Sequence, residues 1–124
     1  MPKLLVVDDE SSIRLLYAQE LAEEGHDVTT AASAVEAVEK LEQGDFDLVV
    51  LDIKLKNESG LDLLQKIVKE RHEMPVILCT AFSFYKDDFS AWLADGYIVK
   101  SSDLTELKEE IQRVLAKKSV RREE

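Results

Sequence analysis

The sequence contains one cysteine, Cys79, and no long hydrophobic stretch. A single cysteine cannot form an internal disulfide, so we expect a reducing cytoplasm as the compartment. The start, Met-Pro-Lys, does not resemble a signal peptide, and no apolar run approaches the roughly 18 residues that a membrane helix needs. We therefore expect a soluble, cytoplasmic protein in which Cys79 is a small core residue rather than a reactive thiol.

Positive charge is also scarce. The chain has 16 Lys and Arg against 26 Asp and Glu, which gives a net charge of −10. Nucleic acids and anionic membranes both bind basic surfaces, so this balance argues against direct binding to either. With 124 residues, 45% of them hydrophobic, the chain suits one packed core without disulfides and is too short for two domains.

Short apolar runs alternate with amphipathic segments. The predicted strands are Lys3–Val7, Asp27–Ala31, Leu48–Leu51, Pro75–Cys79 and Ile98–Val99. The predicted helices are Ser11–Glu24, 33–44, Leu61–Glu70, a short or irregular one around Asp88–Ala94, and 103–116, with a loop at Lys54–Gly60. This alternation predicts an α/β fold in which five helices cover both faces of a five-stranded parallel sheet. We place the domain at residues 1–118 and a charged tail, or the start of a linker, at 119–124.

Polar residues follow four of the predicted strands. Asp8 and Asp9 end the first, Asp52 the third, Thr80 the fourth and Lys100 the fifth. In an open α/β sheet, ligands bind outside the carboxyl ends of the strands, where strand order reverses. We therefore expect these five side chains to converge at one edge of the sheet.

The residue types at this edge indicate a cation and a phosphoryl group. Three carboxylates within a few ångströms need a cation among them to stay ionised, and oxygen ligands alone select Mg²⁺ or Mn²⁺. Lys100 adds a positive charge suited to a phosphoryl oxygen, and Thr80 adds a hydroxyl donor. A carboxylate in such a site can attack phosphorus and form an aspartyl phosphate.

Each residue taken alone has a simpler explanation. Asp8 or Asp9 could cap the helix that begins at Ser11, Thr80 could be an ordinary strand-end threonine, and Lys100 a solvated surface lysine. Their occurrence together at four strand ends favours the site.

Four ordered segments carry a family resemblance: L-L-V-V-D-D-E, then D-L-V-V-L-D-I-K-L with Gly60 eight residues past Asp52, then P-V-I-L-C-T-A and G-Y-I-V-K. Over residues 3–116 the chain resembles the receiver domain of two-component response regulators, the family of the bacterial chemotaxis regulator. The resemblance implies a flavodoxin-like three-layer sandwich with strand order 2-1-3-4-5.

The resemblance also implies a role for each site residue. Asp52 is similar to the phosphoacceptor that takes a phosphoryl group from a histidine kinase or a phosphotransfer protein. Asp8 and Asp9 resemble the acidic pair that holds Mg²⁺ together with Asp52 and the backbone carbonyl of Lys54.

Further residues match the part of the family pattern that contacts the phosphoryl group. Thr80 and Lys100 resemble the phosphoryl-contacting pair, and the backbone N–H groups of Lys54 and Ala81 complete the cradle. Tyr97 resembles the aromatic switch that turns inward when Thr80 moves.

Regulation rather than metabolism is therefore the expected role. The domain would catalyse its own Mg²⁺-dependent phosphorylation and dephosphorylation, and phosphorylation would change a partner-binding surface. A downstream effector would bind through the Phe82–Tyr97 region and the last helix, and a homodimer is an alternative.

Three departures from the family pattern leave a second function open. Ser101 follows Lys100 and Lys56 follows Leu55, where the family usually has proline, and the segment from Thr80 to Lys100 is shorter than usual. The alternative is a receiver-like interaction module that works without phosphorylation. The aromatic residues between Thr80 and Lys100 either fill the core beside a shortened helix or form a specialised partner face.

Two other classes fit poorly. Hydrolases with an aspartyl nucleophile typically carry a second Asp two residues later, where this chain has Lys54. A flavin-binding protein of this fold needs a phosphate-cradling loop after the first strand, and here that stretch is acidic.

Overall fold

The computed structural model describes residues 1–123; the side chains of Phe84 and of residues 118–123 lie outside the description, as does Glu124. The α-helices are α1 (Ser11–Glu23), α2 (Ala34–Gln43), α3 (Gly60–Glu70) and α4 (Thr105–Glu123). The strands are β1 (Lys3–Val7), β2 (Asp27–Ala31), β3 (Leu48–Leu51), β4 (Lys54–Leu55), β5 (Glu58–Ser59), β6 (Val76–Thr80) and β7 (Gly96–Val99). The predicted tail at 119–124 falls on these undescribed side chains, so a domain boundary at residue 118 stays a prediction.

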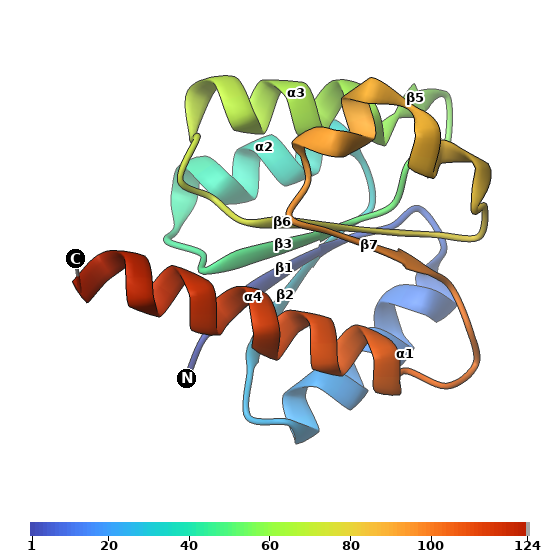
Figure 1. Ribbon diagram of the computed structural model, residues 1–124. Coiled ribbons are helices and arrows are strands. Elements are labelled where there is room, and N and C mark those ends of the chain that lie inside the picture. Colours follow the sequence, from blue (N-terminus) through green and yellow to red (C-terminus); the bar gives the residue numbers. More distant parts are fainter. Residues whose placement is uncertain (124) are drawn as a thin grey trace.

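The five longer strands form one parallel sheet in the order β2-β1-β3-β6-β7. This confirms the predicted order, because β6 and β7 are the fourth and fifth strands of that sheet. Helices α2 and α3 lie on one side of the sheet and α1 and α4 on the other (Figure 1). The strand order reverses between β1 and β3, which is where this fold binds its ligands.

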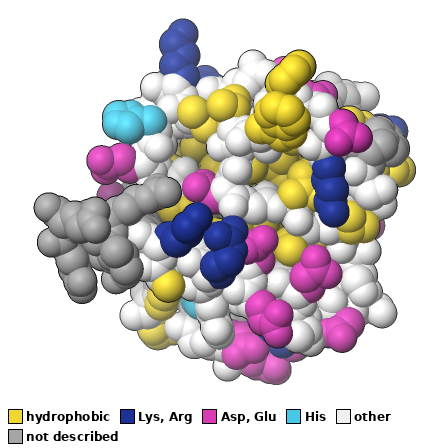
Figure 2. Space-filling model, viewed as in Figure 1, with side chains coloured by type: hydrophobic (Ala, Val, Ile, Leu, Met, Phe, Trp, Pro, Cys, Tyr) yellow, Lys and Arg dark blue, Asp and Glu magenta, His cyan; other side chains and the backbone are white. Residues whose placement is uncertain are grey.

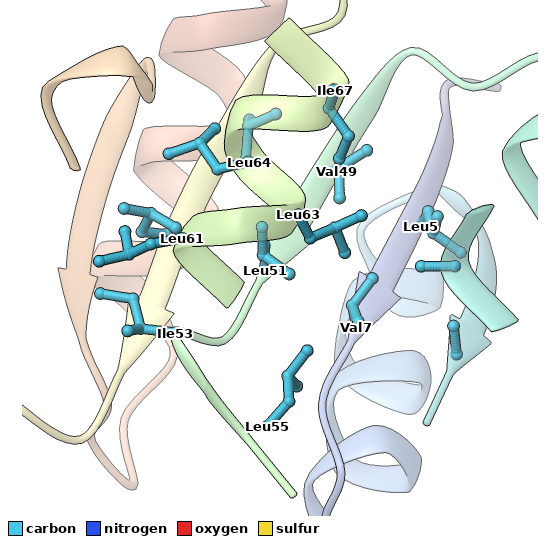
Figure 3. Close-up of a cluster of buried hydrophobic side chains, with 14 of the residues drawn as sticks. Leu5, Val7, Val49, Leu51, Ile53, Leu55, Leu61, Leu63, Leu64 and Ile67 are labelled. Carbon is cyan, nitrogen blue, oxygen red and sulfur yellow. The ribbon is translucent and has the colours of Figure 1, made fainter. Parts of the chain in front are cut away.

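Alternation along the central strands divides the core into two clusters, one on each face of the sheet. In β1, Leu5 and Val7 face α2 and α3, whereas Leu4 and Val6 face α1 and α4. The central strands β3 and β6 alternate in the same way, so both faces of each are buried. Figure 3 shows the cluster beneath α3, which Leu55 also reaches from its separate short strand.

The fourth helix, predicted to be short or irregular, is both, whereas the expected number of five α-helices is wrong because the described residues contain four. Two short 3₁₀ helices, η1 (Phe84–Asp87) and η2 (Phe89–Leu93), occupy its place on the α2–α3 side of the sheet. Asp88 between them has an extended backbone and caps η2 by accepting a hydrogen bond from the Ser90 N–H. This extended residue prevents one continuous helix, and the prediction of a short element was correct.

The predicted loop after Asp52 is a small antiparallel hairpin of β4 and β5, which we call the β4–β5 hairpin. Its turn contains Asn57 at φ 60°, a left-handed conformation that Asn tolerates better than most residues. At its end the Gly60 N–H donates to the Ile53 carbonyl at 2.5 Å. Gly60 therefore lies so close to Asp52 that a Cβ atom there would overlap the Asp52 carbonyl oxygen.

Among the described residues every peptide bond is trans, including Lys100–Ser101, which replaces the family's usual Lys-Pro pair. Within residues 1–123, we find no helix that combines the length and the apolar character needed to cross a membrane.

We predict that Gly60→Ala destabilises the domain by about 3 kcal/mol, because backbone atoms of Asp52 and Ile53 must move to admit the new methyl group. Urea unfolding followed by circular dichroism measures this change. Gly44→Ala is the matched control, since its Cβ would meet only ordinary contacts at 3.8 Å and beyond. Equal stabilities of the two variants would contradict the close approach at Gly60.

Candidate functional site

The sheet places the predicted site residues at one edge by extending its hydrogen bonding past the strand ends. The Asp8 N–H donates to the Ala31 carbonyl at 3.1 Å, and the Asp52 N–H donates to Val7 at 3.0 Å. Each aspartate is therefore the first residue after its strand, and a backbone hydrogen bond to the neighbouring strand still fixes its position. The β1–β3 pairing then puts Asp8 beside Asp52, as the sequence predicted.

The three acids form a compact cluster. Each of Asp8, Asp9 and Asp52 offers one carboxylate oxygen, and these oxygens lie within 4.8 Å of one another. Asp8 and Asp52 are buried, whereas Asp9 is partly exposed. Such an all-oxygen set with one member open to solvent suits a hard cation that keeps some water ligands.

Lys100 lies between two of these acids. Its Nζ atom is 2.7 Å from Asp8 Oδ2 and 2.9 Å from Asp52 Oδ2. From the sequence we expected Lys100 to contact a phosphoryl oxygen. Its ion pairs with Asp8 and Asp52 were not predicted. Three carboxylates and one ammonium still leave an excess of negative charge, which keeps the cluster attractive to a cation.

The pKa directions follow from this arrangement. Burial raises the pKa of Asp52 above its ordinary value, and the hydrogen bond from Lys100 opposes that effect only in part. Burial alone would lower the pKa of Lys100, but its hydrogen bonds to Asp8 and Asp52 outweigh burial and raise it. Because one ammonium is shared between two carboxylates, Lys100 stays charged while the burial of Asp52 is only partly offset.

Thr80 and a cavity complete the site. The Thr80 side chain is buried, and its Oγ1 atom has no hydrogen-bond partner among the described residues. A cavity of about 420 Å³ opens at the same edge. Its lining includes Asp9, Asp52, Lys54, Ala81 and Lys100. Thr80 itself does not line this cavity, but its carbonyl accepts a hydrogen bond from the Lys100 N–H at 2.7 Å, so Thr80 lies next to Lys100. A free hydroxyl on a residue next to this lysine fits a bound oxyanion accompanied by a metal ion.

Phe82, which borders the cavity, contacts both Lys54 and Tyr97. The Lys54 N–H donates to Asp52 Oδ1 at 3.3 Å, and the Lys54 Nζ lies 5.4 Å from the centroid of the Phe82 ring. The Tyr97 hydroxyl donates to the Phe82 carbonyl at 2.5 Å. Lys54 and Ala81 border the cavity, and their backbone roles stay a prediction. The Tyr97 hydroxyl is hydrogen-bonded to Phe82, two residues after Thr80.

Sequence reasoning missed Arg14. Its Nη1 atom donates to the Asp8 carbonyl at 2.8 Å and so fixes the loop that carries the acids. Glu10 is the N-cap residue of α1 and makes no side-chain capping bond. Its N–H instead donates to Asp8 Oδ1 at 2.9 Å. One Arg on an amphipathic helix gives no sequence signal that separates it from a solvated one.

A parallel sheet in this order, with an acidic cluster and a lysine at the carboxyl ends of its strands, defines a flavodoxin-like domain whose acidic site suits a cation. The sequence profile of the response regulator receiver domain matches residues 4–112. This match covers most of the chain, which therefore belongs to the response regulator receiver domain family.

Solved structures agree with this assignment. Response regulator TrrA of Thermotoga maritima, solved in complex with Mg²⁺–BeF, has 45% sequence identity and a TM-score of 0.89 over 92% of this chain and 99% of its own. The complex of TrrA with histidine kinase ThkA contains a similar chain, with a TM-score of 0.87 at 45% identity over 93% of this chain and 99% of that chain.

Relatives in longer regulators agree as well. Transcriptional regulatory protein TcrA of Mycobacterium tuberculosis is 36% identical over 85% of this chain and 42% of its own length. Two-component response regulator PhoP of Pseudomonas aeruginosa is 33% identical over 94% of this chain and 53% of its own. The chain thus spans about half the length of these relatives.

Cys79 directly precedes Thr80 and is buried on the opposite face of β6 from Leu78. Burial raises the pKa of its thiol to about 11, although the hydroxyl of Tyr17, 3.5 Å from the sulfur, partly opposes this. A raised thiol pKa means that the neutral, unreactive form persists through neutral pH.

We therefore predict that Cys79 resists a thiol reagent at pH 8 in the folded protein and reacts fully in denaturant. About one thiol in a thousand would be ionised at that pH, and the buried sulfur is shielded as well. With a reagent that releases a coloured thiolate on reacting, absorbance measures the extent of labelling. Labelling at the same rate with and without denaturant would contradict this interpretation of Cys79.

Proposed function

We propose that this domain accepts a phosphoryl group on Asp52 and passes the signal to a partner-binding surface. The observation that carries the proposal is the buried Asp52 carboxylate, which pairs with the Lys100 ammonium and clusters with two further acids. An Asp52 oxygen would attack the phosphorus of a phosphohistidine. The P–N bond then breaks, and the donor imidazole leaves with the bonding electron pair.

Other residues of the chain would hold the transferred group. The Lys100 ammonium faces the same carboxylate, so it can balance charge on a phosphoryl oxygen, and Thr80 can donate its free hydroxyl to another. The N–H groups of Lys54 and Ala81, at the border of the cavity, would complete the cradle. Hydrolysis of the resulting acyl phosphate by water would return the domain to its resting state.

The acid cluster fits Mg²⁺, with Mn²⁺ as a second choice. Asp8, Asp9 and Asp52 would hold the ion together with the backbone carbonyl of Lys54. When bound, Mg²⁺ would offset the negative charge of the phosphoryl oxygens. The complex of TrrA with Mg²⁺–BeF supports this choice of ion and of phosphoryl group.

Partners are proposed from the family and from one exposed surface. A histidine kinase, or a phosphotransfer protein, would be the donor, as TrrA forms a complex with ThkA. Phe89 and Trp92 on η2 are 78% and 64% exposed, and their rings form a T-shaped pair at 4.8 Å. Hydrophobic side chains gather at the surface in this region (Figure 2). We propose this face, with part of α4, for a downstream effector or a second copy of the chain.

The cytoplasm is the proposed location. The family match supports it, together with the single cysteine, which cannot form an internal disulfide.

We predict that the wild-type protein incubated with Mg²⁺ and acetyl phosphate gains one phosphoryl group and that Asp52→Asn gains none. Asn has nearly the same shape, but its neutral amide lacks the nucleophilic carboxylate. Mass spectrometry of the intact chain measures the addition. Asp62→Asn, which changes an exposed acid on α3, is the control and should behave as wild type. Equal labelling of the wild type and Asp52→Asn would exclude Asp52 as the acceptor.

The single tryptophan, Trp92, should report on the signalling change. Its Nε1 atom donates to the Lys86 carbonyl, and the Lys86 ammonium lies 5.7 Å from the centroid of the Tyr97 ring, which is bonded to Phe82. We predict a saturable change in Trp92 fluorescence on adding beryllofluoride with Mg²⁺, absent in Asp52→Asn. A wild type that binds beryllofluoride without any such change would instead favour an interaction module that phosphorylation does not control.

A further inference from the structure

Glu58 makes a contact that the family match does not explain. It lies on β5 of the β4–β5 hairpin, and its Oε2 atom accepts a hydrogen bond from the Ala34 N–H at 2.9 Å. Ala34 is the first residue of α2, whose N-terminal N–H groups have no partners within the helix. A carboxylate at this position gains both a charge-assisted hydrogen bond and a favourable interaction with the helix dipole.

This contact completes a circuit of hydrogen bonds around the acidic cluster. The N–H of Asp52 bonds to Val7, and the N–H of Asp8 bonds to Ala31, so β3 is tied to β1 and β1 to β2. Both bonds are between backbone atoms at strand ends. Glu58 then ties the β4–β5 hairpin, which follows β3, back to α2, which follows β2. The Glu58 contact uses a side chain, whereas the other two hydrogen bonds join backbone atoms of the sheet.

The outer end of the hairpin is exposed at Lys56, Asn57 and Glu58, so the hydrogen bond of Glu58 holds a part of the hairpin that burial does not. Its base is fixed by the buried Leu55 and by the close approach of Gly60 to Asp52. Beyond the base it lies between two hollows, the cavity over Asp52 and a groove of about 530 Å³ between α2 and α3. Asn57 at the turn lines both, so movement of the turn changes the shape of each.

We propose that Glu58 is a positioning residue for the acidic site: by holding the β4–β5 hairpin against the N-terminus of α2, it fixes the Lys54 backbone beside Asp52. The proposal rests on the proposed function, in which Lys54 lends its carbonyl to Mg²⁺ and its N–H to the phosphoryl group. Glu58 itself touches neither.

Three variants separate positioning from loss of charge. Glu58→Ala removes the contact, and Glu58→Gln keeps an acceptor oxygen without the charge. Glu39→Ala is the matched control. Glu39 is an exposed acid on α2 that lines the same groove, and the side-chain cap of α2 comes from Ser33 rather than from Glu39. Amide hydrogen exchange of the metal-free proteins reports on the hairpin, and calorimetric titration with beryllofluoride in excess Mg²⁺ reports on the site.

We expect faster exchange at Ala34 and at residues 54–59 in Glu58→Ala, unchanged exchange in Glu39→Ala, and an intermediate result in Glu58→Gln. Loss of one charge-assisted hydrogen bond should weaken beryllofluoride binding about three- to tenfold in Glu58→Ala. Exchange equal to that of Glu39→Ala would overturn the contact, and equal beryllofluoride affinity would overturn the positioning role. No binding by the wild type would contradict the proposed function instead, while the exchange result still decides whether Glu58 holds the hairpin.

Discussion

The Lys100 ammonium, shared between the carboxylates of Asp8 and Asp52, is the interaction on which this site depends. Two buried carboxylates on neighbouring strands repel each other, and without a cation one of them would have to bind a proton. Lys100 arrives from the edge strand β7, so the acids and their counter-charge meet only because all three strands are parallel and in register. One ammonium cannot balance three carboxylates, and the remaining negative charge attracts a metal ion.

The surrounding structure holds this charge cluster from two sides. On one side, Gly60 permits the chain after Asp52 to turn back tightly, and Glu58 ties the resulting hairpin to α2. On the other side, Thr80 leads within two residues to Phe82, whose carbonyl accepts the Tyr97 hydroxyl bond. The first side is suited to hold a ligand in place. The second is suited to transmit its presence to the exposed aromatic face on η2.

The sheet and the residues at its edge could be predicted because their signals are local. Apolar runs such as Leu48–Leu51 identify buried parallel strands, and the polar residue after each run identifies the edge. The 3₁₀ character of the fourth helical segment could not, because the extended backbone of Asp88 is set by packing and capping rather than by periodicity. The role of Glu58 could not be predicted either. It is one of 26 acidic residues, and only the folded chain brings it to the N-terminus of α2.

The most direct test of the acidic cluster is a calorimetric titration of the protein with Mg²⁺ alone. We predict one ion bound per chain, with thermal stability rising with Mg²⁺ concentration as linkage requires, and loss of both effects in Asp9→Asn. Asp9 is the informative position because it belongs to the cluster but is not among the carboxylates that pair with Lys100. A wild type that shows neither heat nor stabilisation, or an Asp9→Asn variant that binds Mg²⁺ equally well, would contradict a cation site at these three acids.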